Sequence, residues 1–257
     1  MPAPGLASSG LHYLPVPGPV LGVLAAGLAL AVTLIALRAI TYSYERMGIP
    51  GWAALLLLAA SLLGSYVNIP LVQYPDAKVV ALARTTYFGV TYVVPVVRDW
   101  PGMVLAVNLG GALIPVGLSV YLVLRRRLLV RAFFCTALVA AAVHFFAHPV
   151  PGLGIAVPIY VAPLAAVAAA LLASRAQAAP LAYVGGSLGT LIGGDLLNLR
   201  HILDLGSPIV SIGGAGTFDG IYVTGILALL LACLIGDRMR GTQSGEPADP
   251  ARAGRAR

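Results

Sequence analysis

Two aspartates stand inside apolar stretches of this chain, and their type and spacing are suited to chemistry. Asp195 lies in GGSLGTLIGGDLLNL and Asp219 lies in GGAGTFDGIYVTG, 24 positions further along. An ionised carboxylate in hydrocarbon is disfavoured by about 2.5 to 3.5 kcal/mol on insertion scales, so aspartates in such segments mark functional sites. The pair predicts a catalytic or ion-binding site.

Two carboxylates at close range cannot both ionise easily, because their negative charges repel each other. They then share a proton and can act as base and acid around a nucleophilic water, as in aspartic proteases. The alternative is structural: each carboxylate lies at the membrane interface, caps a helix or pairs with a partner such as Arg200. Thr217 and Asp219 open a predicted helix, where negative charge is favourable. Both interpretations remain open from the sequence.

Other polar residues lie within or at the ends of the predicted helices. They are Asn68, Asn108, His144, His148 and Asn198. We expect the amides of Asn68 and Asn108 to form hydrogen bonds between helices, with ion ligation as the alternative, because an amide in hydrocarbon seeks a partner. The histidines, one helical turn apart, need additional carboxylates to hold a metal, and no HExxH motif is present. We therefore predict neither a metal nor a cofactor.

Glycines recur at helical spacing on both sides of the paired aspartates. Gly185, Gly189 and Gly193 repeat every four positions, and Gly216 and Gly220 do the same in the last apolar stretch. Such stripes allow another helix backbone to approach closely. We expect them to pack the last two helices together and to bring the two carboxylates within reach of one water.

Composition indicates the kind of scaffold that must position these residues. Of the 257 residues, 59% are hydrophobic and 10% are charged, and the mean hydropathy is +0.93. These values are typical of an integral membrane protein whose main partner is the lipid bilayer. The net charge of +7 comes from arginines in loops and tail, so it predicts membrane orientation and not binding of nucleic acid.

Apolar runs long enough to cross about 30 Å of hydrocarbon recur along the chain. They predict an all-α, polytopic helical bundle with about seven spans in one transmembrane domain, residues 19–236. Residues 1–18 are expected to be flexible, and residues 237–257 to form a disordered polar tail. The Val-, Thr- and Tyr-rich segment 73–102 predicts an extracytoplasmic β-hairpin between spans two and three. The predicted spans are 19–40, 52–71, 103–124, 130–147, 155–173, 180–197 and 215–235.

The positive charges predict the orientation of these spans. Arginines are concentrated in alternate connections, among them Arg125, Arg126 and Arg127. The positive-inside rule therefore favours an N-terminus outside and a cytoplasmic C-terminus. In this orientation nearly every strongly polar residue within the spans lies in the outer leaflet.

Several segments resemble a known family. WAALLLLAASLLGSYVNIPL, AVNLGGALIP, LGTLIGGDLLNL and SIGGAGTFDGIYVTGILA are similar to a prokaryotic membrane family catalogued as domain of unknown function sixteen-fourteen. The resemblance covers roughly residues 50 to 236. It implies a polytopic protein of a prokaryotic cell (inner) membrane and no particular activity.

A more distant resemblance is to intramembrane aspartyl proteases of the presenilin and signal-peptide-peptidase type. These place one Asp on each of two consecutive spans, the second within a GxGD motif, and Asp195 with Asp219 matches that arrangement. The motif itself differs, because Phe218 stands where its second glycine is expected. The late PAL motif is absent, and seven spans are predicted where that family has nine.

Three functions are compatible with this sequence. The first is an intramembrane hydrolase, with a membrane protein or peptide as substrate, that uses Asp195 and Asp219. The second is a proton- or cation-coupled transporter or channel that uses the same carboxylates. Its difficulty is the scarcity of polar residues in the inner leaflet. The third is a non-catalytic membrane scaffold whose hairpin binds a partner.

Overall fold

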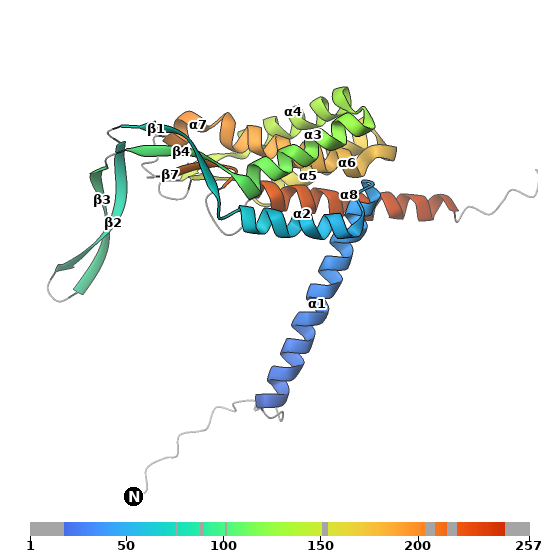
Figure 1. Cartoon of the computed structure of the whole chain (residues 1–257), viewed down its shortest axis with the longest axis horizontal. Coiled ribbons are helices and arrows are strands. Elements are labelled where there is room, and N and C mark those ends of the chain that lie inside the picture. The colour runs from blue at the N-terminus through green and yellow to red at the C-terminus, as the bar shows by residue number, and fades with distance from the viewer. Residues whose placement is uncertain are drawn as a thin grey trace, which may run out of the picture. The chain divides into compact units, whose positions relative to one another are not determined.

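The computed structural model describes residues 18–75, 77–87, 90–100, 102–150, 154–203, 209–214 and 220–244. The chain divides into two units, residues 1–39 and 40–257. Helix α1 (Gly18–Arg46) makes up the described part of the first unit and continues into the second (Figure 1). Of the segment 1–18, only Gly18 is described. The expected single transmembrane domain, residues 19–236, stays a prediction.

The second unit is mostly helical, with seven further α-helices in its described part. Two π-helical segments, η1 (Leu109–Leu113) and η3 (Leu191–Leu196), extend α3 at its start and α6 at its end. A short 3₁₀ turn, η2 (Arg175–Gln177), precedes α6. The α-helices are α2 (Gly51–Gly64), α3 (Ile114–Arg126), α4 (Leu129–Phe146), α5 (Val161–Ala173), α6 (Ala178–Thr190), α7 (Leu199–Leu203) and α8 (Gly220–Ser244).

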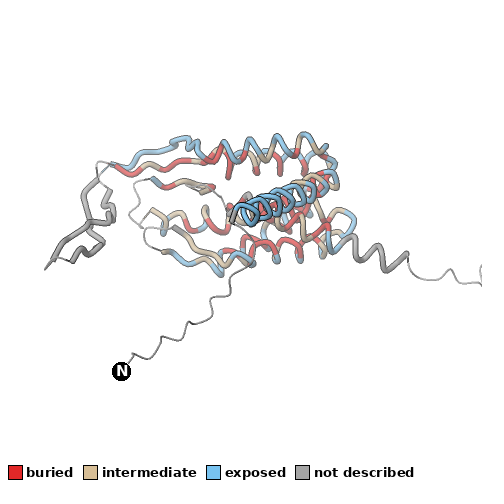
Figure 2. The backbone as a smooth tube through the Cα atoms, turned by 90° about the horizontal axis from the view of Figure 1, so that it is seen from below, coloured by how far each residue is buried: buried red, intermediate tan, exposed pale blue. Residues whose placement is uncertain are grey.

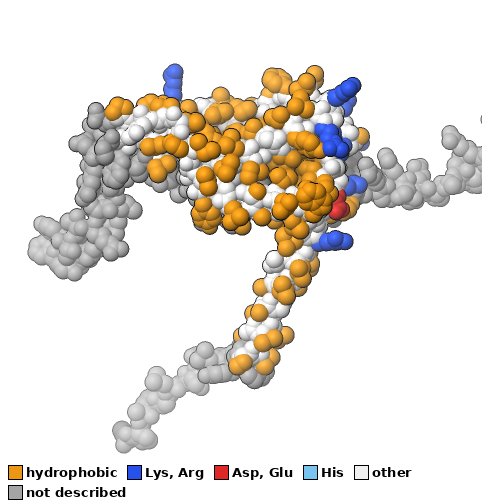
Figure 3. Space-filling model, viewed as in Figure 1, with side chains coloured by type: hydrophobic (Ala, Val, Ile, Leu, Met, Phe, Trp, Pro, Cys, Tyr) orange, Lys and Arg blue, Asp and Glu red, His pale blue; other side chains and the backbone are white. Residues whose placement is uncertain are grey.

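Within the described ranges, three helices are long and apolar enough to cross a membrane: Pro19–Arg46, Leu109–Arg126 and Leu129–Phe146. Three shorter apolar helices, Gly51–Gly64, Val161–Ala173 and Val223–Ile235, accompany them. Large apolar side chains such as Leu63, Phe133 and Leu172 are exposed on α2, α4 and α5. Figure 3 shows hydrophobic side chains spread over the visible surface of the bundle. Such a surface suits contact with lipid.

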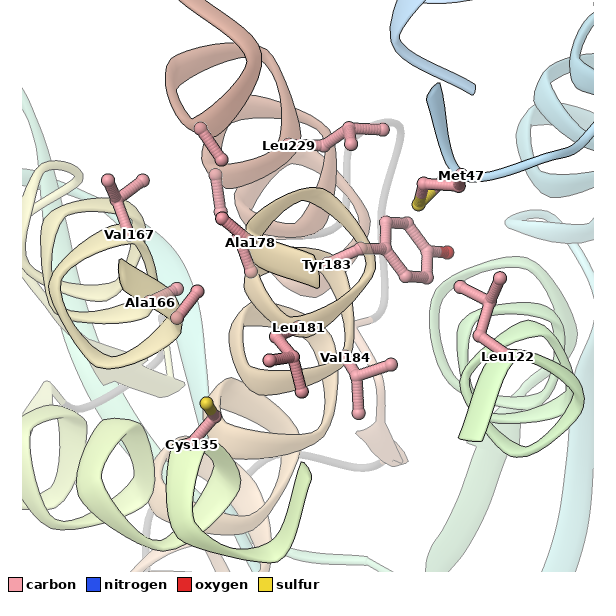
Figure 4. Close-up of a cluster of buried hydrophobic side chains, with 14 of the residues drawn as sticks. Met47, Leu122, Cys135, Ala166, Val167, Ala178, Leu181, Tyr183, Val184 and Leu229 are labelled. Atoms are coloured by element: carbon pink, nitrogen blue, oxygen red, sulfur yellow. The ribbon is translucent and has the colours of Figure 1, made fainter. Parts of the chain in front are cut away.

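Helix α6 is the centre of the bundle, since it packs against α3, α4, α5 and α8. Its sequence AAPLAYVGGSLGT combines small and apolar residues, and most of it is buried. In the bundle as a whole, the buried residues face inward and the exposed ones outward (Figure 2). Tyr183, Leu181 and Val184 point from α6 toward different neighbouring helices (Figure 4). Small residues on all sides let several helices approach one axis.

The strands lie at one end of the bundle (Figure 1). Strand β1 (Asn68–Tyr74) pairs antiparallel with β4 (Met103–Asn108), and β2 (Ala77–Tyr87) pairs antiparallel with β3 (Val90–Trp100). The β2–β3 pairing keeps the register of β1–β4, from Val72↔Leu105 to Tyr87↔Val90, as a separate two-stranded sheet. Its extracytoplasmic location stays a prediction. Strand β7 (Ile209–Ile212) adds to β4 in parallel, and β5 (His148–Val150) pairs with β6 (Gly154–Ala156).

The strands β1 and β4 correct the predicted bounds of spans two and three. Helix α2 ends at Gly64, and 68–71 is strand; residues 103–108 are strand, and only 109–126 is helical. Pro70 cannot continue a helix, and the short apolar run in β4 carries no helical periodicity. Strand pairing on both edges of β4 then stabilises the extended form.

Other helices also differ from the sequence prediction at their ends. Helix α1 continues to Arg46 and not to residue 40, and α5 begins at Val161 and not at residue 155. Helix α4 ends at Phe146, so His148 lies in β5 and not one helical turn after His144. Pro149 explains this, because the residue before a proline avoids the α conformation. Helix α8 runs to Ser244, past residue 237 where the polar tail was expected to begin.

The end of the bundle remote from the strands carries arginines, and we call it the arginine end. It includes Arg125 and Arg126 in the last turn of α3, and Arg175 in η2 before α6. Most of the Lys and Arg side chains visible in Figure 3 lie at this end. The two ends of the second unit therefore differ, with arginines at one and a small sheet at the other.

Candidate functional site

Asp195 lies in the π-helical segment η3, where α6 approaches the sheet. One of its carboxylate oxygens, Oδ2, accepts a hydrogen bond of 2.8 Å from the backbone N–H of Gly213. The side chain is partly buried. Within the described residues, no Lys or Arg pairs with it, which does not support the alternative of an ion pair with Arg200. Asp195 is thus oriented by a backbone dipole and not by a cation.

Gly213 can hold this carboxylate because of its position directly after β7. Its φ is +88°, and that of Gly214 is +90°, so both lie in the left-handed region that favours glycine. A Cβ atom on Gly213 would stand 2.5 Å from the Cβ of Ala112 in η1. Glycine is therefore required here both by conformation and by space.

Asn108 and Asn68 meet directly across the β1–β4 pairing. The buried Asn108 donates from Nδ2 to the carbonyl oxygen of Ser65 at 2.7 Å and to Oδ1 of Asn68 at 3.0 Å. Its Oδ1 accepts the N–H of Gly111 at 2.8 Å and so caps η1. The two amides bond to each other between strands, and not between helices as the sequence predicted.

Ser211 joins this network from β7. Its hydroxyl donates to Oδ1 of Asn68 at 2.6 Å, so three strands are linked by side chains. Ser211 is two residues before Gly213, the donor to Asp195. The network of Asn108, Asn68 and Ser211 therefore positions the strand whose end holds the carboxylate.

Asn198 closes the π-helical segment. Its Nδ2 donates to the carbonyl oxygens of Gly193 at 2.8 Å and Gly194 at 3.1 Å. Ending a helix in a buried place leaves carbonyls without partners, and the amide satisfies two of them. Asn198, like Asn108, thus bonds to backbone groups at the end of a π-helical segment.

The glycine stripe on α6 faces α4 and not α8. Added Cβ atoms on Gly185, Gly189 and Gly193 would meet Cys135, Val139 and Ala140 of α4. The approach of α6 to α8 uses Gly225 instead, where a Cβ would collide with the Ser187 hydroxyl. Gly220 is the first residue of α8, and Gly216 lies outside the described residues.

Asp219 also lies outside the described residues, so its distance from Asp195 is not defined by the structure. Residues close to both aspartates in sequence do pack together. Leu191, four residues before Asp195, and Ile221, two residues after Asp219, belong to one buried cluster with Ala112. The flanks of both aspartates thus converge on η1.

His144 and His148 are both exposed. In the described ranges no group of three or more His, Cys, Asp or Glu residues is arranged to hold a metal. Of the two predicted catalytic carboxylates, only that of Asp195 lies in the part of the chain that the structure describes.

Sequence reasoning missed three residues that build the site. Ser211 and Gly213 act through a strand pairing that joins residues about a hundred positions apart. Ser61 donates from its hydroxyl to the carbonyl oxygen of Gly110 at 2.6 Å and fixes α2 against η1. The glycine pairs at 110–111, 193–194 and 213–214 were the available signal, since each one marks a break in regular structure beside a polar side chain.

Comparisons with known proteins give one match. Neither the curated proteins nor the solved structures contain a match to this chain. A family model described as Protein of unknown function (DUF1614) matches residues 62–231, which include α6, η3 and the Asp195 and Asp219 positions. The chain therefore belongs to the DUF1614 family.

Proposed function

We propose that this protein is an intramembrane hydrolase that cleaves peptide bonds with Asp195 and Asp219. The observation that carries the proposal is the hydrogen bond from Gly213 N–H to one oxygen of the Asp195 carboxylate. It fixes the side chain at a break between helix and sheet, with no Lys or Arg partner among the described residues. A carboxylate placed in this way is suited to bind and activate water.

The packing of Leu191 with Ile221 supports the participation of Asp219, because these residues flank the two aspartates in sequence. In the proposed reaction one carboxylate accepts a proton from water as the water oxygen attacks the peptide carbonyl carbon. The other, protonated, carboxyl donates a proton toward the carbonyl oxygen. The C–N bond then breaks as the first carboxyl returns its proton to the leaving amine, and the second carboxylate regains a proton from a hydroxyl of the diol. This is the chemistry implied by the remote resemblance to presenilin-type proteases.

We further propose that the bundle crosses a prokaryotic cell membrane with seven spans, the sheet outside and the arginine end in the cytoplasm. Arg125 and Arg126 close α3 at one end, whereas Asn108 caps η1 at the other. This separation supports the orientation through the positive-inside rule. The substrate would then be a membrane protein or peptide that presents its scissile bond near the outer face.

The proposal is tested with the purified full chain in detergent or lipid nanodiscs. The probe is a mixture of synthetic 20-residue apolar peptides in water enriched in ¹⁸O, analysed by mass spectrometry. Hydrolysis places one ¹⁸O in each new carboxyl terminus. We expect cleavage by the wild type and a loss of about 100-fold or more in Asp195→Asn and in Asp219→Asn.

The matched control is Glu45→Gln, which removes an exposed carboxylate from the last turn of α1. It should cleave as the wild type does. Asp195→Asn should still fold, because an amide oxygen can accept the Gly213 N–H. Cleavage that persists in Asp195→Asn would exclude a shared-proton mechanism.

A further inference from the structure

Three residues of the central helix form a hydroxyl-bearing stripe that the proposed hydrolysis does not use. Tyr183, Ser187 and Thr190 are spaced by four and three positions, so they lie on one face of α6. Asp195 follows five residues later in η3. The stripe therefore leads along α6 toward the carboxylate.

Two of these hydroxyl groups are buried without a protein partner. The oxygen atoms of Ser187 and Thr190 have no hydrogen bond among the described residues, and Ser187 is 1% exposed. Serine and threonine in apolar helices ordinarily bond to a carbonyl one turn earlier, and these two do not. A buried hydroxyl without a partner costs free energy, so such a position favours an ordered water.

The stripe faces α8 at a place where the helices are close. The Ser187 hydroxyl and the Tyr183 ring are the atoms that a Cβ on Gly225 would meet. Leu191 and Ile221 continue the same interface toward the sheet. The stripe is thus enclosed between α6 and α8 and is not turned toward lipid.

The length of the stripe is comparable to a membrane leaflet. From Tyr183 to Asp195 there are twelve residues, or about 18 Å of helix. Tyr183 packs edge-to-face on Tyr44, with ring centroids 6.1 Å apart. Tyr44 is three residues before Met47, whose carbonyl oxygen is bound by Arg126 at the arginine end. At the opposite end, Asp195 is partly exposed.

We propose that the α6–α8 interface is a proton path in which waters bridge Tyr183, Ser187 and Thr190 to Asp195. Successive stripe residues are separated by about 4.5 to 6 Å of helix rise, which suits one bridging water between neighbouring hydroxyl groups. Protons pass between hydroxyl and water without the release of any group, and the Asp195 carboxylate exchanges them with the solvent at the sheet. The hydroxyl groups of the stripe continue the polar positions from Asp195 along α6 toward the arginine end. Transport of a proton requires such polar groups along its route.

The test is proton flux into liposomes that contain the full chain. A potassium gradient with valinomycin sets the membrane potential, and an enclosed pH-sensitive dye reports the flux. We expect the wild type to exceed protein-free liposomes at least about tenfold. Thr190→Val, which keeps the shape and removes the hydroxyl, should lower the flux about tenfold, and Thr190→Ser should retain it. Asp195→Asn should reduce the flux to the protein-free level.

Thr136→Val is the matched control. Thr136 on α4 also has a buried hydroxyl without a described partner, but it lies off the α6 stripe. It should conduct as the wild type does. Ser187→Ala gives a second test of the stripe if Thr190→Val does not remain monodisperse on size exclusion.

Wild-type flux equal to protein-free liposomes overturns this inference, and so does unchanged flux in a folded Thr190→Val protein. The outcome is independent of the proposed hydrolysis. A chain that cleaves peptides without conducting protons overturns the path alone. A chain that conducts without cleaving overturns the hydrolase alone.

Discussion

The backbone N–H of Gly213 donates a 2.8 Å hydrogen bond to Oδ2 of Asp195, across a junction between strand β7 and the π-helical segment η3. The two residues are 18 positions apart, one in the helix bundle and the other at the end of a strand. Ser211, two residues before Gly213, is itself held by Asn68. The orientation of the carboxylate therefore depends on the small sheet as well as on its own helix.

Gly213→Ala is expected to destabilise the protein and to release Asp195. The φ of +88° strains an alanine, and its Cβ would overlap Ala112. Strain of this kind costs on the order of 1–3 kcal/mol, and the overlap adds to it. The measurement is the midpoint of thermal unfolding in detergent.

The control for that substitution is Gly117→Ala in the exposed part of α3. A Cβ on Gly117 meets nothing within 4 Å. Alanine is favoured over glycine in a helix by about 1 kcal/mol, so Gly117→Ala should hold or raise the midpoint. Similar losses in both variants would mean that the glycine at 213 has no special role.

Two adjacent glycines in η3 should respond differently to alanine. A Cβ on Gly193 would overlap the backbone of Ala140 in α4, whereas a Cβ on Gly194 would lie 3.8 Å from Val143, an ordinary contact. We expect Gly193→Ala to cost roughly 1–3 kcal/mol of unfolding free energy, and Gly194→Ala roughly 0.5 kcal/mol or less. Chemical unfolding in mixed micelles measures both. Equal effects would contradict the observed packing of α6 on α4.

The regular helices were predictable because their signals are local. Helix α4 begins after the basic run that closes α3 and ends just before His148–Pro149, and its observed bounds differ from the predicted 130–147 by one residue at each end. Asp195 was also recognisable, since a carboxylate in an apolar run is unusual in any fold.

The remainder depended on contacts between distant segments. The run MVLAVN is too short to show a helical or strand period, and it is a strand because β1 and β7 pair on its two edges. The role of Gly213 could not be predicted for another reason. It binds Asp195 through its backbone N–H, and a glycine in the sequence indicates only that a turn is possible, not which side chain the turn will bind.

Asn108→Ala should be far more destabilising than Asn68→Ala. Asn108 is 1% exposed, and its loss leaves the Ser65 carbonyl and the Gly111 N–H without their partner. Each buried group left unpaired costs about 1–3 kcal/mol. Asn68 is exposed, so water can replace it on Ser211. Thermal unfolding of the two variants checks the order, and a larger loss for Asn68→Ala would contradict it.

Arg126 should protect the α1–α2 connection from proteolysis. Its guanidinium donates to the Met47 carbonyl oxygen at 2.7 Å and to Oε1 of Gln177 at 3.0 Å. It therefore links the end of α3 to the connection after α1 and to the turn before α6. Arg126→Ala removes both bonds, and a loss of about 1 kcal/mol in local stability raises the open population roughly fivefold. Trypsin cleavage after Arg46, followed by mass spectrometry, should accelerate by that factor.

Arg125→Ala is the matched control for Arg126→Ala, because Arg125 contacts the exposed Tyr121 of its own helix. It should leave cleavage after Arg46 unchanged. Arg126→Lys separates charge from geometry: a single ammonium group keeps the charge but cannot span both acceptors as the planar guanidinium does. If the lysine variant resists trypsin as well as the wild type does, then the positive charge alone holds the connection, and the two simultaneous hydrogen bonds of Arg126 are not needed.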